Sequence, residues 1–294
     1  MTTLKFEDTL TEAFLKQRYL EEKRSTLAIA AEVGASETTV CNYLRRFNIP
    51  LRTKARRSPK FVDSSGFDEL STDWHAYWIG FLAADGCVFV NEKRSQARVI
   101  VVLKMSDADH LRNFQQGLRT SAPVIAGYNG QRDVAKITIC NRDLIAALAQ
   151  WGVVPNKTLT MPWPCHLPHE LIPSYIRGYF DGDGTIYQRH RSQPGTHWTE
   201  TVCRFISGSV PFLEGLEREL NKRGIQTNTL YRNQTSNAFV LPLSSKRENL
   251  LAFADLIYQG STVCLERKRA IFREMEAYHA AHPRKGSHLR YQKG

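Results

Sequence analysis

Residues 175–187 are YIRGYFDGDGTIY, and residues 77–89 are YWIGFLAADGCVF. Both stretches begin as apolar, aromatic segments of the kind that forms a buried helix, and both contain an Asp-Gly pair near their end. Aligning these pairs matches Asp85 with Asp183, which follows it by 98 residues. An internal repeat of this length predicts a protein of two similar halves related by a pseudo-two-fold axis.

Small residues recur four positions apart in both apolar segments. They are Gly80 and Ala84 in the first segment, and Gly178 and Gly182 in the second. On a helix, residues with this spacing share one face. Glycine costs about 1 kcal/mol in a helix interior, so paired small residues need a packing reason. We therefore expect the two helices to contact each other through these residues, while the larger residues pack outward into each half's own sheet.

Each segment ends on a glycine, Gly86 or Gly184, that is typical of a helix stop. The acid before each glycine would lie at a helix C-terminus, where the helix dipole makes a carboxylate mildly unfavourable. Two such ends brought together repel further, unless a divalent cation and then a phosphate lie between them. Asp181 corresponds to Ala83, which leaves the acids just before the glycines as the symmetric pair.

The N-terminal part of the chain predicts three short helices. Helical spacing of apolar residues covers 11–25 and 26–33, and Ser36 is a suitable N-cap for a third helix after a tight turn at Gly34. A helix, a short glycine-containing turn and a second helix match the helix-turn-helix pattern. We expect the last helix to contact DNA through Thr38, Thr39, Asn42, Arg45 and Arg46; a helical bundle that binds a protein, or nothing, is the alternative.

Residues 45–60, RRFNIPLRTKARRSPK, contain seven Lys or Arg and no acid. Pro50 and Pro59 prevent one continuous helix through this stretch. Beside a recognition helix we expect a basic arm that follows DNA phosphates, and its contacts would come from Arg52, Lys54, Arg56 and Arg57. A solvated linker without a binding role is the alternative.

The chain of 294 residues has a formal net charge of +11, which favours a polyanionic partner: nucleic acid before an anionic membrane. Its longest apolar runs, such as residues 99–103, are far too short to span a bilayer, and the N-terminus has no apolar signal core. We therefore expect a cytoplasmic, nucleoid-associated protein. Six cysteines without a Cys-x-x-Cys pair indicate reduced thiols, and a metal site at Cys165, His166 and His169 is disfavoured because a fourth ligand is lacking.

From residue 74 to 275 the chain alternates helix-like and strand-like segments, twice in the same order. The first half predicts helices at 74–85, 107–118 and 141–151, and strands near 86–91, 97–104, 123–129 and 133–139. The second predicts helices at 170–183, 210–223 and 245–258, and strands near 184–190, 200–206, 226–232 and 238–243. The expected domains are a helix-turn-helix domain at 1–50, a basic linker at 51–73, the two repeats at 74–165 and 166–278, and a basic tail at 279–294.

The two Asp-Gly segments resemble the LAGLIDADG motif, and the chain is similar to a single-chain, two-repeat LAGLIDADG homing endonuclease over roughly residues 74–275. The resemblance implies an α+β fold: two pseudo-symmetric αββαββα repeats that form a DNA-binding saddle of antiparallel sheets, here beside a small all-α helix-turn-helix domain. The first copy departs from the family pattern at Trp78 and Ala83, but neither position is the catalytic aspartate.

The resemblance also implies the site. The motif acids of the family bind Mg²⁺ (or Mn²⁺) at the centre of the active site, which carries over to Asp85 and Asp183, with Gly86 and Gly184 in the same metal site. A lysine near the end of each repeat often neutralises the developing charge in the family. The matching positions here are Lys157 and Lys268, for which an ordinary surface lysine is the alternative.

Several polar residues of the predicted strands have the chemistry to contact DNA. Arginine with asparagine and glutamine suits the edges of guanine and adenine. A shift of one residue in strand register would turn each side chain to the other face, so the choice depends on register. The candidates are Lys93, Arg94, Arg98, Lys136, Arg189, Arg191, Arg204, Arg232, Asn233 and Gln234.

The leading hypothesis is a site-specific, metal-dependent endonuclease that cuts both strands of a long, asymmetric DNA target. Two halves in one chain predict a monomer, and the lack of splicing-junction residues favours an unfused protein. The alternative is a DNA- or RNA-binding regulator or intron maturase on the same scaffold, but retention of both acids favours cleavage. A helix-turn-helix regulator that senses a small ligand is a third possibility, which leaves the duplicated Asp-Gly ends unexplained.

Overall fold

The computed structural model describes residues 6–51, 60–128, 133–193 and 196–281. The chain divides into two compact units, Met1–Ser58 and Pro59–Gly294. Each unit has a hydrophobic core of its own, so each is stabilised by its own packing.

Short helices form the smaller unit. In chain order they are α1 (Glu12–Leu15), a π-helix (Lys16–Glu21), α2 (Thr26–Val33) and α3 (Glu37–Arg46). Gly34 adopts a left-handed conformation with φ of 69° and ends α2. Ser36 then accepts a hydrogen bond from the Thr39 backbone N–H at 3.1 Å, which caps α3 as the sequence indicates. A core that includes Leu15, Ile29, Val40 and Leu44 holds the helices together.

The larger unit contains the two predicted repeats. The first consists of α4 (Asp73–Asp85), β1 (Cys87–Asn91), β2 (Gln96–Lys104), α5 (Ala108–Gly117), β3 (Ile125–Tyr128), β4 (Asp133–Ile139) and α6 (Arg142–Gln150). The second consists of α7 (Ile172–Asp183), β5 (Gly184–Gln193), β6 (Thr196–Ser207), α8 (Val210–Lys222), β7 (Tyr231–Arg232), β8 (Phe239–Pro242) and α9 (Arg247–Tyr258), followed by α10 (Glu266–Ala281).

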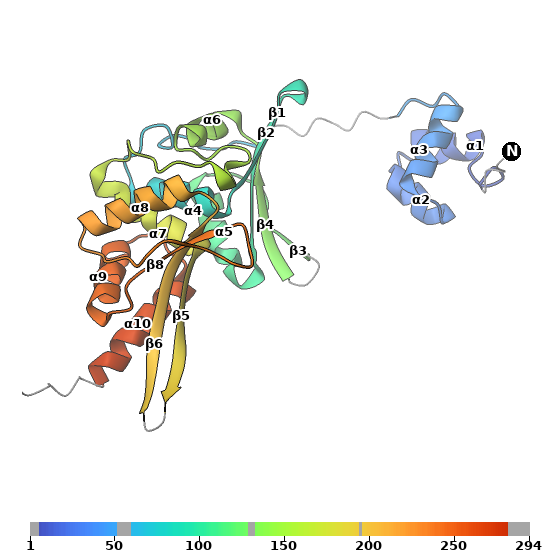
Figure 1. Ribbon diagram of the computed structural model, residues 1–294. Coiled ribbons are helices and arrows are strands. Elements are labelled where there is room, and N and C mark those ends of the chain that lie inside the picture. The colour runs from blue at the N-terminus through green and yellow to red at the C-terminus, as the bar shows by residue number, and fades with distance from the viewer. Residues whose placement is uncertain (1–5, 52–59, 129–132, 194–195, 282–294) are drawn as a thin grey trace, which may run out of the picture. The chain divides into compact units, whose positions relative to one another are not determined.

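Within the described residues, each repeat forms one four-stranded antiparallel sheet. The strand orders are β1-β2-β4-β3 and β5-β6-β8-β7, which are the same order in the two halves. The two sheets and their matching order confirm the predicted α+β fold of two αββαββα repeats. In Figure 1, α4 and α7 lie side by side, and each leads directly into the first strand of its own sheet.

One hydrophobic core runs through both repeats and surrounds the first motif helix. Every residue of α4 from Ala76 to Ala83 is buried, which explains why the segment is apolar on all sides rather than on one stripe. A polar contact also joins the two helices near the start of α4. Asp73 accepts hydrogen bonds from Arg177 and Ser174 of α7, both at 2.5 Å, so the repeats are linked by charge as well as by packing.

The segment from Lys60 to Thr72 belongs to the core of the larger unit, although the sequence places it in a linker at 51–73. Phe67 is fully buried, and its carbonyl accepts a hydrogen bond from Trp151 Nε1 at 2.6 Å. The Asp63 backbone N–H donates to the Leu118 carbonyl at 2.8 Å. Apolar residues spaced along an otherwise polar stretch anchor it, so the linker prediction is wrong for residues 60–73.

The C-terminal boundary also differs from the expectation. Helix α10 continues to Ala281, past the expected start of a basic tail at residue 279, and the sequence analysis assigned no helix to this region. Phe272 and Met275 of α10 are buried against the core, which holds the helix in place. In the second sheet, β5 and β6 are longer than predicted and β7 is shorter.

None of the helices in the described part of the chain combines the length and the apolar character that a bilayer crossing requires.

Candidate active site

The two motif helices approach each other through their small residues. A Cβ atom at Gly80 would overlap the Tyr175 carbonyl oxygen of α7, and a Cβ at Gly178 would overlap the Tyr77 carbonyl oxygen of α4. One turn further on, a Cβ at Gly182 would overlap the Cβ of Ala84. Only glycine leaves room for these backbone contacts, so the spacing seen in the sequence corresponds to a helix–helix contact. The contact brings the C-terminal ends of α4 and α7 together.

Asp85 and Asp183 are the last residues of these two helices. The Asp85 side chain keeps contact with solvent, and Asp183 is half-buried. Burial, and after it the nearby charge of Asp85, raises the pKa of Asp183 to about 6. Burial also raises the pKa of Asp85, against the opposing effect of Lys268 and Lys157. The helix ends thus hold two carboxylates that repel each other in a partly desolvated place.

Lys157 and Lys268 bind equivalent backbone atoms in the two halves. Lys157 Nζ donates to the Gly86 carbonyl oxygen at 2.5 Å, and Lys268 Nζ donates to the Gly184 carbonyl oxygen at 2.5 Å. Both glycines directly follow a motif acid, so each ammonium lies beside the C-terminus of a motif helix, where a cation is favoured. Both lysines are buried, at 7% and 5% exposure, which rules out the ordinary surface lysine.

The two lysines reach these equivalent places from different elements. Lys157 belongs to a short 3-10 turn, Lys157–Leu159, whereas Lys268 lies in the first turn of α10. Lys268 Nζ also donates to the Phe180 carbonyl oxygen at 2.6 Å and to that of Gly182 at 3.3 Å. Burial lowers the pKa of Lys157, and burial lowers that of Lys268 to about 8. Two buried cations therefore lie near one exposed and one half-buried carboxylate.

The two carboxylates offer too few oxygen ligands for a divalent cation such as Mg²⁺, unless water and phosphate oxygens complete its coordination. No cluster of three or more His, Cys, Asp or Glu side chains lies within the described residues. Asp85 and Asp183 could supply the side-chain oxygens, since Mg²⁺ commonly binds one or two carboxylates together with waters and substrate phosphates. The Gly86 and Gly184 carbonyls, expected at the metal, accept hydrogen bonds from the lysines, although a carbonyl oxygen retains a second lone pair.

A small cavity lined by residues of both repeats lies beside Asp183. Its volume is about 30 Å³, enough for one water, and Lys157, Asp183, Tyr179 and Ser207 are among its lining residues. An ammonium and a carboxylate therefore line a space of water size, which is the setting that a hydrolytic water needs.

Asp181 has a role in the fold that the sequence analysis did not identify. Its carboxylate accepts hydrogen bonds from Tyr77 Oη at 2.9 Å, Tyr258 Oη at 3.0 Å and the Leu265 backbone N–H at 2.6 Å. Leu265 directly precedes α10, which carries Lys268. Asp181 thus connects both motif helices to α9 and to the start of α10. The aligned motifs show that Asp181 corresponds to Ala83 in the first half. They do not reveal its hydrogen-bond partners, which lie far away in the sequence.

The structure places the candidate DNA-contacting residues of the larger unit as follows. Arg98 and Lys136 lie on the face of the first sheet that points away from the core, and Arg189 and Arg204 lie on the matching face of the second. The Nε atoms of Arg98, Arg189 and Arg204 are buried without a hydrogen-bond partner. Lys93 and Arg94 are exposed between β1 and β2. Arg232 is exposed at the end of β7, and after it Gln234 is exposed and Asn233 is half-buried. Arg191 is part of β5, but its side chain is outside the described atoms.

In the smaller unit, α3 presents most of its candidate contacts to solvent. Thr38, Asn42, Arg45 and Arg46 are exposed, while Thr39 is half-buried. Arg46 forms an ion pair with Glu7 at 3.0 Å, and Arg45 donates to Asn42 Oδ1 at 2.9 Å. The basic-arm candidates Arg52, Lys54, Arg56 and Arg57 lie outside the described residues.

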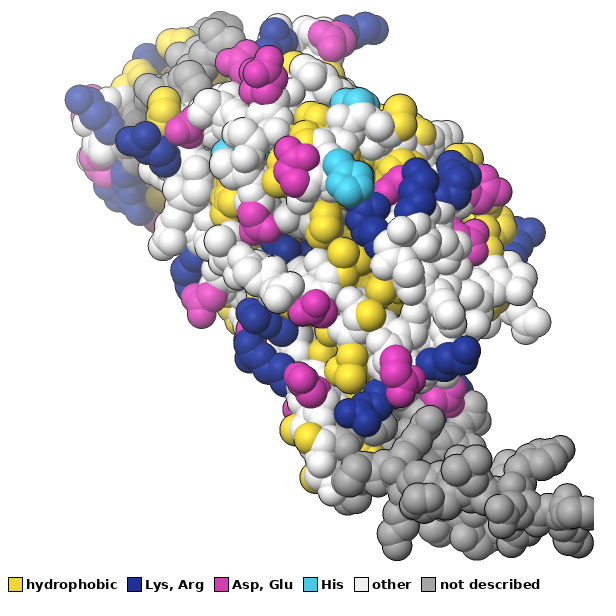
Figure 2. All heavy atoms as spheres, turned by 90° about the vertical axis from the view of Figure 1, so that its left-hand side faces the viewer, with side chains coloured by type: hydrophobic (Ala, Val, Ile, Leu, Met, Phe, Trp, Pro, Cys, Tyr) yellow, Lys and Arg dark blue, Asp and Glu magenta, His cyan; other side chains and the backbone are white. Residues whose placement is uncertain are grey.

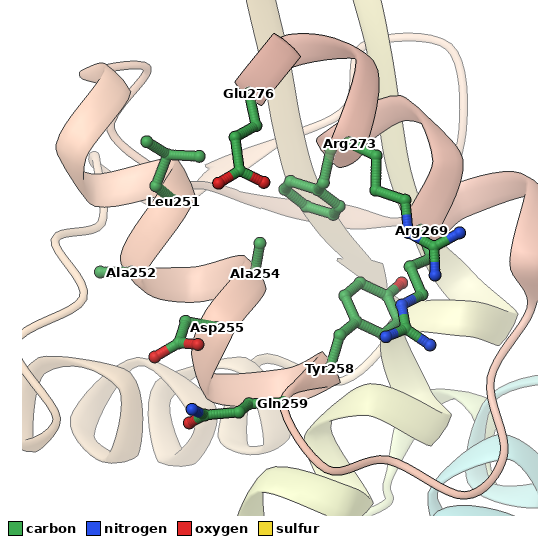
Figure 3. A pocket seen from close by; sticks show the side chains of 10 residues that line it. Leu251, Ala252, Ala254, Asp255, Tyr258, Gln259, Arg269, Arg273 and Glu276 are labelled. Carbon is green, nitrogen blue, oxygen red and sulfur yellow. The ribbon is translucent and has the colours of Figure 1, made fainter. Parts of the chain in front are cut away.

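The larger hollows of the molecule lie away from the acid pair. One of about 520 Å³ lies between α9 and α10, where Asp255, Tyr258, Arg269 and Glu276 are among the side chains that surround it (Figure 3). The Arg269 guanidinium lies over the Tyr258 ring at 5.8 Å, so it already has a partner. Figure 2 shows the face at the left of Figure 1, where Lys and Arg are interspersed with Asp and Glu rather than gathered in one basic patch. Neither surface has the single-signed charge that a nucleic acid requires.

Comparisons with known proteins identify a family for part of the chain. The LAGLIDADG-like domain family matches residues 170–258, which run from the start of α7 to the end of α9. No curated protein sequence matches the chain.

The chain also resembles solved structures, and the first of them has the same fold. The LAGLIDADG meganuclease I-AabMI bound to uncleaved DNA is similar with a TM-score of 0.50 and 15% identity, over 72% of this chain and 91% of that one. The I-SmaMI LAGLIDADG homing endonuclease bound to cleaved DNA has a TM-score of 0.49 and 10% identity, over 70% and 88% of the two chains. For the homing endonuclease I-DmoI the TM-score is 0.47 at 16% identity, over 72% and 99%. Residues 170–258 are therefore a LAGLIDADG-like domain, within a chain that has the fold of the LAGLIDADG meganucleases.

Proposed function

We propose that this protein is a site-specific DNA endonuclease that uses a divalent cation to hydrolyse one phosphodiester bond in each strand. The observation that carries the proposal is the paired site: Asp85 and Asp183 end two helices in contact, and Lys157 and Lys268 bind equivalent carbonyls beside them. Two equivalent sets of groups at one centre match a substrate with two equivalent bonds. The DNA-bound state of I-AabMI, whose fold the chain shares, is consistent with a duplex substrate.

Each chemical group then has a role. The carboxylates of Asp85 and Asp183 would hold Mg²⁺ or Mn²⁺, which would supply Lewis-acid polarisation of the phosphate and lower the pKa of water. Lys157 and Lys268 stabilise the negative charge that develops during phosphodiester hydrolysis, and their burial makes that interaction stronger than in water. Because the backbone carbonyls fix both ammonium groups, little reorganisation is needed when the charge develops.

A cleavage assay with a matched variant tests the proposal. The protein is incubated with a library of long duplex DNAs that includes its own genomic neighbourhood, with Mg²⁺ and separately with EDTA. Discrete double-strand cuts that require Mg²⁺ are expected. Asp183→Asn should remove cleavage and retain DNA binding in Ca²⁺, whereas Asp109→Asn, on the exposed surface of α5, should cut as the wild type does.

Two outcomes would contradict the proposal in different ways. If Asp183→Asn cuts normally, the active-site assignment is wrong. If the wild type binds its target tightly without cutting, the scaffold serves binding alone, and structured RNA is the next substrate to test.

We further propose that the smaller unit adds DNA contacts. Exposed Thr38, Asn42 and Arg45 on one side of α3 support this role, because they are short polar and basic side chains of the kind that contacts base edges and phosphates. Covalent attachment raises the effective concentration of this unit at the DNA that the larger unit binds. A second weak contact in the same chain therefore strengthens and lengthens the footprint. The protein would act as a monomer on a long, asymmetric target.

A further inference from the structure

One face of the first sheet is covered by the core, and the other is open. Along β2, Val99 and Val101 are fully buried, while Ile100 is half-buried and Val102 is 40% exposed. We use the term first open face for the outward side chains Phe89, Arg98, Ile100, Val102, Ile125 and Lys136. Cross-strand pairs place them together: Val102 lies opposite Lys136, and Lys136 lies opposite Ile125.

The first open face is continuous with the acid pair. Ile100 lies opposite Cys87, which follows Asp85 by two residues. The face therefore begins at the site where the DNA strands would be cut. A duplex positioned for cleavage at this site would cover the face.

Apolar side chains are unusually exposed on this face. Ile125 is 50% exposed, Val102 is 40% and Phe89 is 36%. Single exposed apolar residues are normal on protein surfaces, but several on one face of a sheet indicate a binding surface.

Cations without acidic partners accompany these apolar side chains. The Arg98 guanidinium lies 4.5 Å from the centre of the Phe89 ring, and its buried Nε has no hydrogen-bond partner among the residues that the structure describes. No acid pairs with Arg98 or Lys136 within the described residues. A protein partner with an apolar patch would leave these cations unmatched. The major groove of DNA matches both properties, because phosphates flank it and the 5-methyl group of thymine projects into it.

The second sheet has different chemistry at the equivalent position. Thr185 also follows its motif acid by two residues, and it lies opposite Arg204. The pair Thr185 and Arg204 thus replaces Cys87 and Ile100. Arginine recognises guanine through O6 and N7, whereas an aliphatic side chain contacts the thymine methyl. The two sheets therefore have unequal requirements for the base pairs nearest the acid pair.

We propose that the first open face recognises thymine 5-methyl groups in one half of the DNA target, through Ile100, Val102 and Ile125. This inference rests on the proposed endonuclease function, and it adds the chemistry of one half-site. The half-site under the second sheet is recognised instead through polar contacts from residues such as Arg204. The target is then asymmetric in its recognition chemistry as well as in its sequence.

Replacement of thymine by uracil tests the proposal, because it removes only the 5-methyl group. The cleaved target is synthesised with uracil for thymine in one half-site at a time, and the dissociation constant is measured in Ca²⁺. Affinity should fall about fourfold for each contacted methyl, since burying a group of that size contributes about 0.8 kcal/mol. The fall should occur in one half-site only.

Two valine variants identify the face responsible. Val102→Thr replaces a methyl by a hydroxyl on the first open face and should remove part of the discrimination between thymine and uracil. Val90→Thr is the matched control, because Val90 is 37% exposed in the same sheet and points to the opposite face. It should discriminate as the wild type does.

The outcomes separate this inference from the function it rests on. Specific cleavage with equal affinity for thymine and uracil targets would overturn the inference and leave the endonuclease assignment intact. If uracil lowers the affinity of Val102→Thr as much as that of the wild type, the methyl contact belongs to another surface. That result would also overturn the inference. If the wild type binds no DNA specifically, both the methyl-recognition inference and the endonuclease assignment are rejected. That result would favour a protein as the partner that covers the first open face.

Discussion

At the scale of single residues, the buried carboxylate of Asp181 is a group that one half of the site has and the other half lacks. Its counterpart in the first half is Ala83, so only the second half has this group. Three hydrogen-bond donors converge on Asp181, including the backbone N–H of Leu265 at the start of α10. The position of Lys268 therefore depends on a contact that Lys157 does not share.

Asp181→Asn should destabilise the protein and slow cleavage unequally in the two strands. The amide would point an N–H group toward at least one of the three donors, and an unsatisfied buried group costs about 1–3 kcal/mol. Displacement of α10 would move Lys268 but leave Lys157 in place. On a supercoiled plasmid with one target site, nicked circles should therefore accumulate before linear DNA. Equal loss of nicking and linearisation, with the free energy of unfolding unchanged, would contradict this role.

His110 should make the protein sensitive to mild acid. The imidazole is buried, and its Nε2–H donates a hydrogen bond to Tyr77 Oη at 2.8 Å, because the Tyr77 hydroxyl proton is donated to Asp181. Burial lowers the pKa of His110 from 6.5 to about 4. Between these values the unfolded chain binds the proton and the folded chain does not, so stability is lost as the pH falls from about 6.5 to 4. The loss is at most about 3.4 kcal/mol.

The comparison that isolates this effect uses two histidine variants. His110→Gln should flatten the decline of the melting temperature between pH 7 and pH 4, relative to wild type. His169→Gln, at an exposed position, should leave the decline unchanged. Parallel curves for His110→Gln and the wild type would show that other groups cause the acid sensitivity.

The residues of the candidate site differ in how far the sequence reveals them. Asp85 and Asp183 are visible because a repeated Asp-Gly pair at a helix end has an electrostatic cost that needs a reason. The partners of Asp181 are not visible, because Tyr77 lies 104 positions before it and Tyr258 77 positions after it. Contacts of that separation depend on the packed fold, which no local pattern encodes.

At the scale of elements, the contact between α4 and α7 is the feature on which the site depends. Gly178→Ala should therefore destabilise the fold, because the new methyl would overlap the Tyr77 carbonyl oxygen of the other helix. Overpacking of this kind costs about 1–3 kcal/mol, although alanine is intrinsically the better helix former. Urea denaturation measures the change in the free energy of unfolding.

Ala84→Gly is the useful contrast on the same helix pair. It removes a methyl group from the contact with Gly182 and should cost only about 1 kcal/mol, from helix propensity. If Gly178→Ala is as stable as the wild type, the two helices can move apart without a decrease in the free energy of unfolding. Close packing would then no longer explain the glycines.

Helix α10 has a local sequence pattern that predicts a helix, although no helix was expected there. The predicted second repeat includes the part of this helix up to residue 278 without an element assigned to it, and a tail was expected from residue 279 because the C-terminal stretch is basic. Phe272 and Met275 are nevertheless three residues apart and both are buried. That spacing is a helical one, so the element was predictable. By contrast, the anchoring of residues 60–72 by Phe67 rests on a tertiary contact with Trp151.

At the scale of the whole molecule, two independent cores imply separable contributions to DNA binding. The larger unit begins at Pro59, and Lys60 Nζ already donates to the Ser121 carbonyl oxygen at 2.5 Å. The groups proposed to be catalytic all lie beyond residue 84. A chain that lacks residues 1–58 should therefore fold and keep the active site.

This truncated chain should cut the same site as the full protein but bind it more weakly and with less dependence on salt. The deleted part contains Arg45, Arg46 and the four basic-arm residues Arg52, Lys54, Arg56 and Arg57. Each phosphate contact that is lost lowers the slope of log affinity against log salt by about 0.9, so three or four lost contacts lower it by about 3. The measurement is a salt titration of binding in Ca²⁺ for both chains, with Arg45→Ala in the full protein as a single-residue comparison. An unchanged slope, together with equal affinity, would show that the smaller unit and the basic arm do not contact the target.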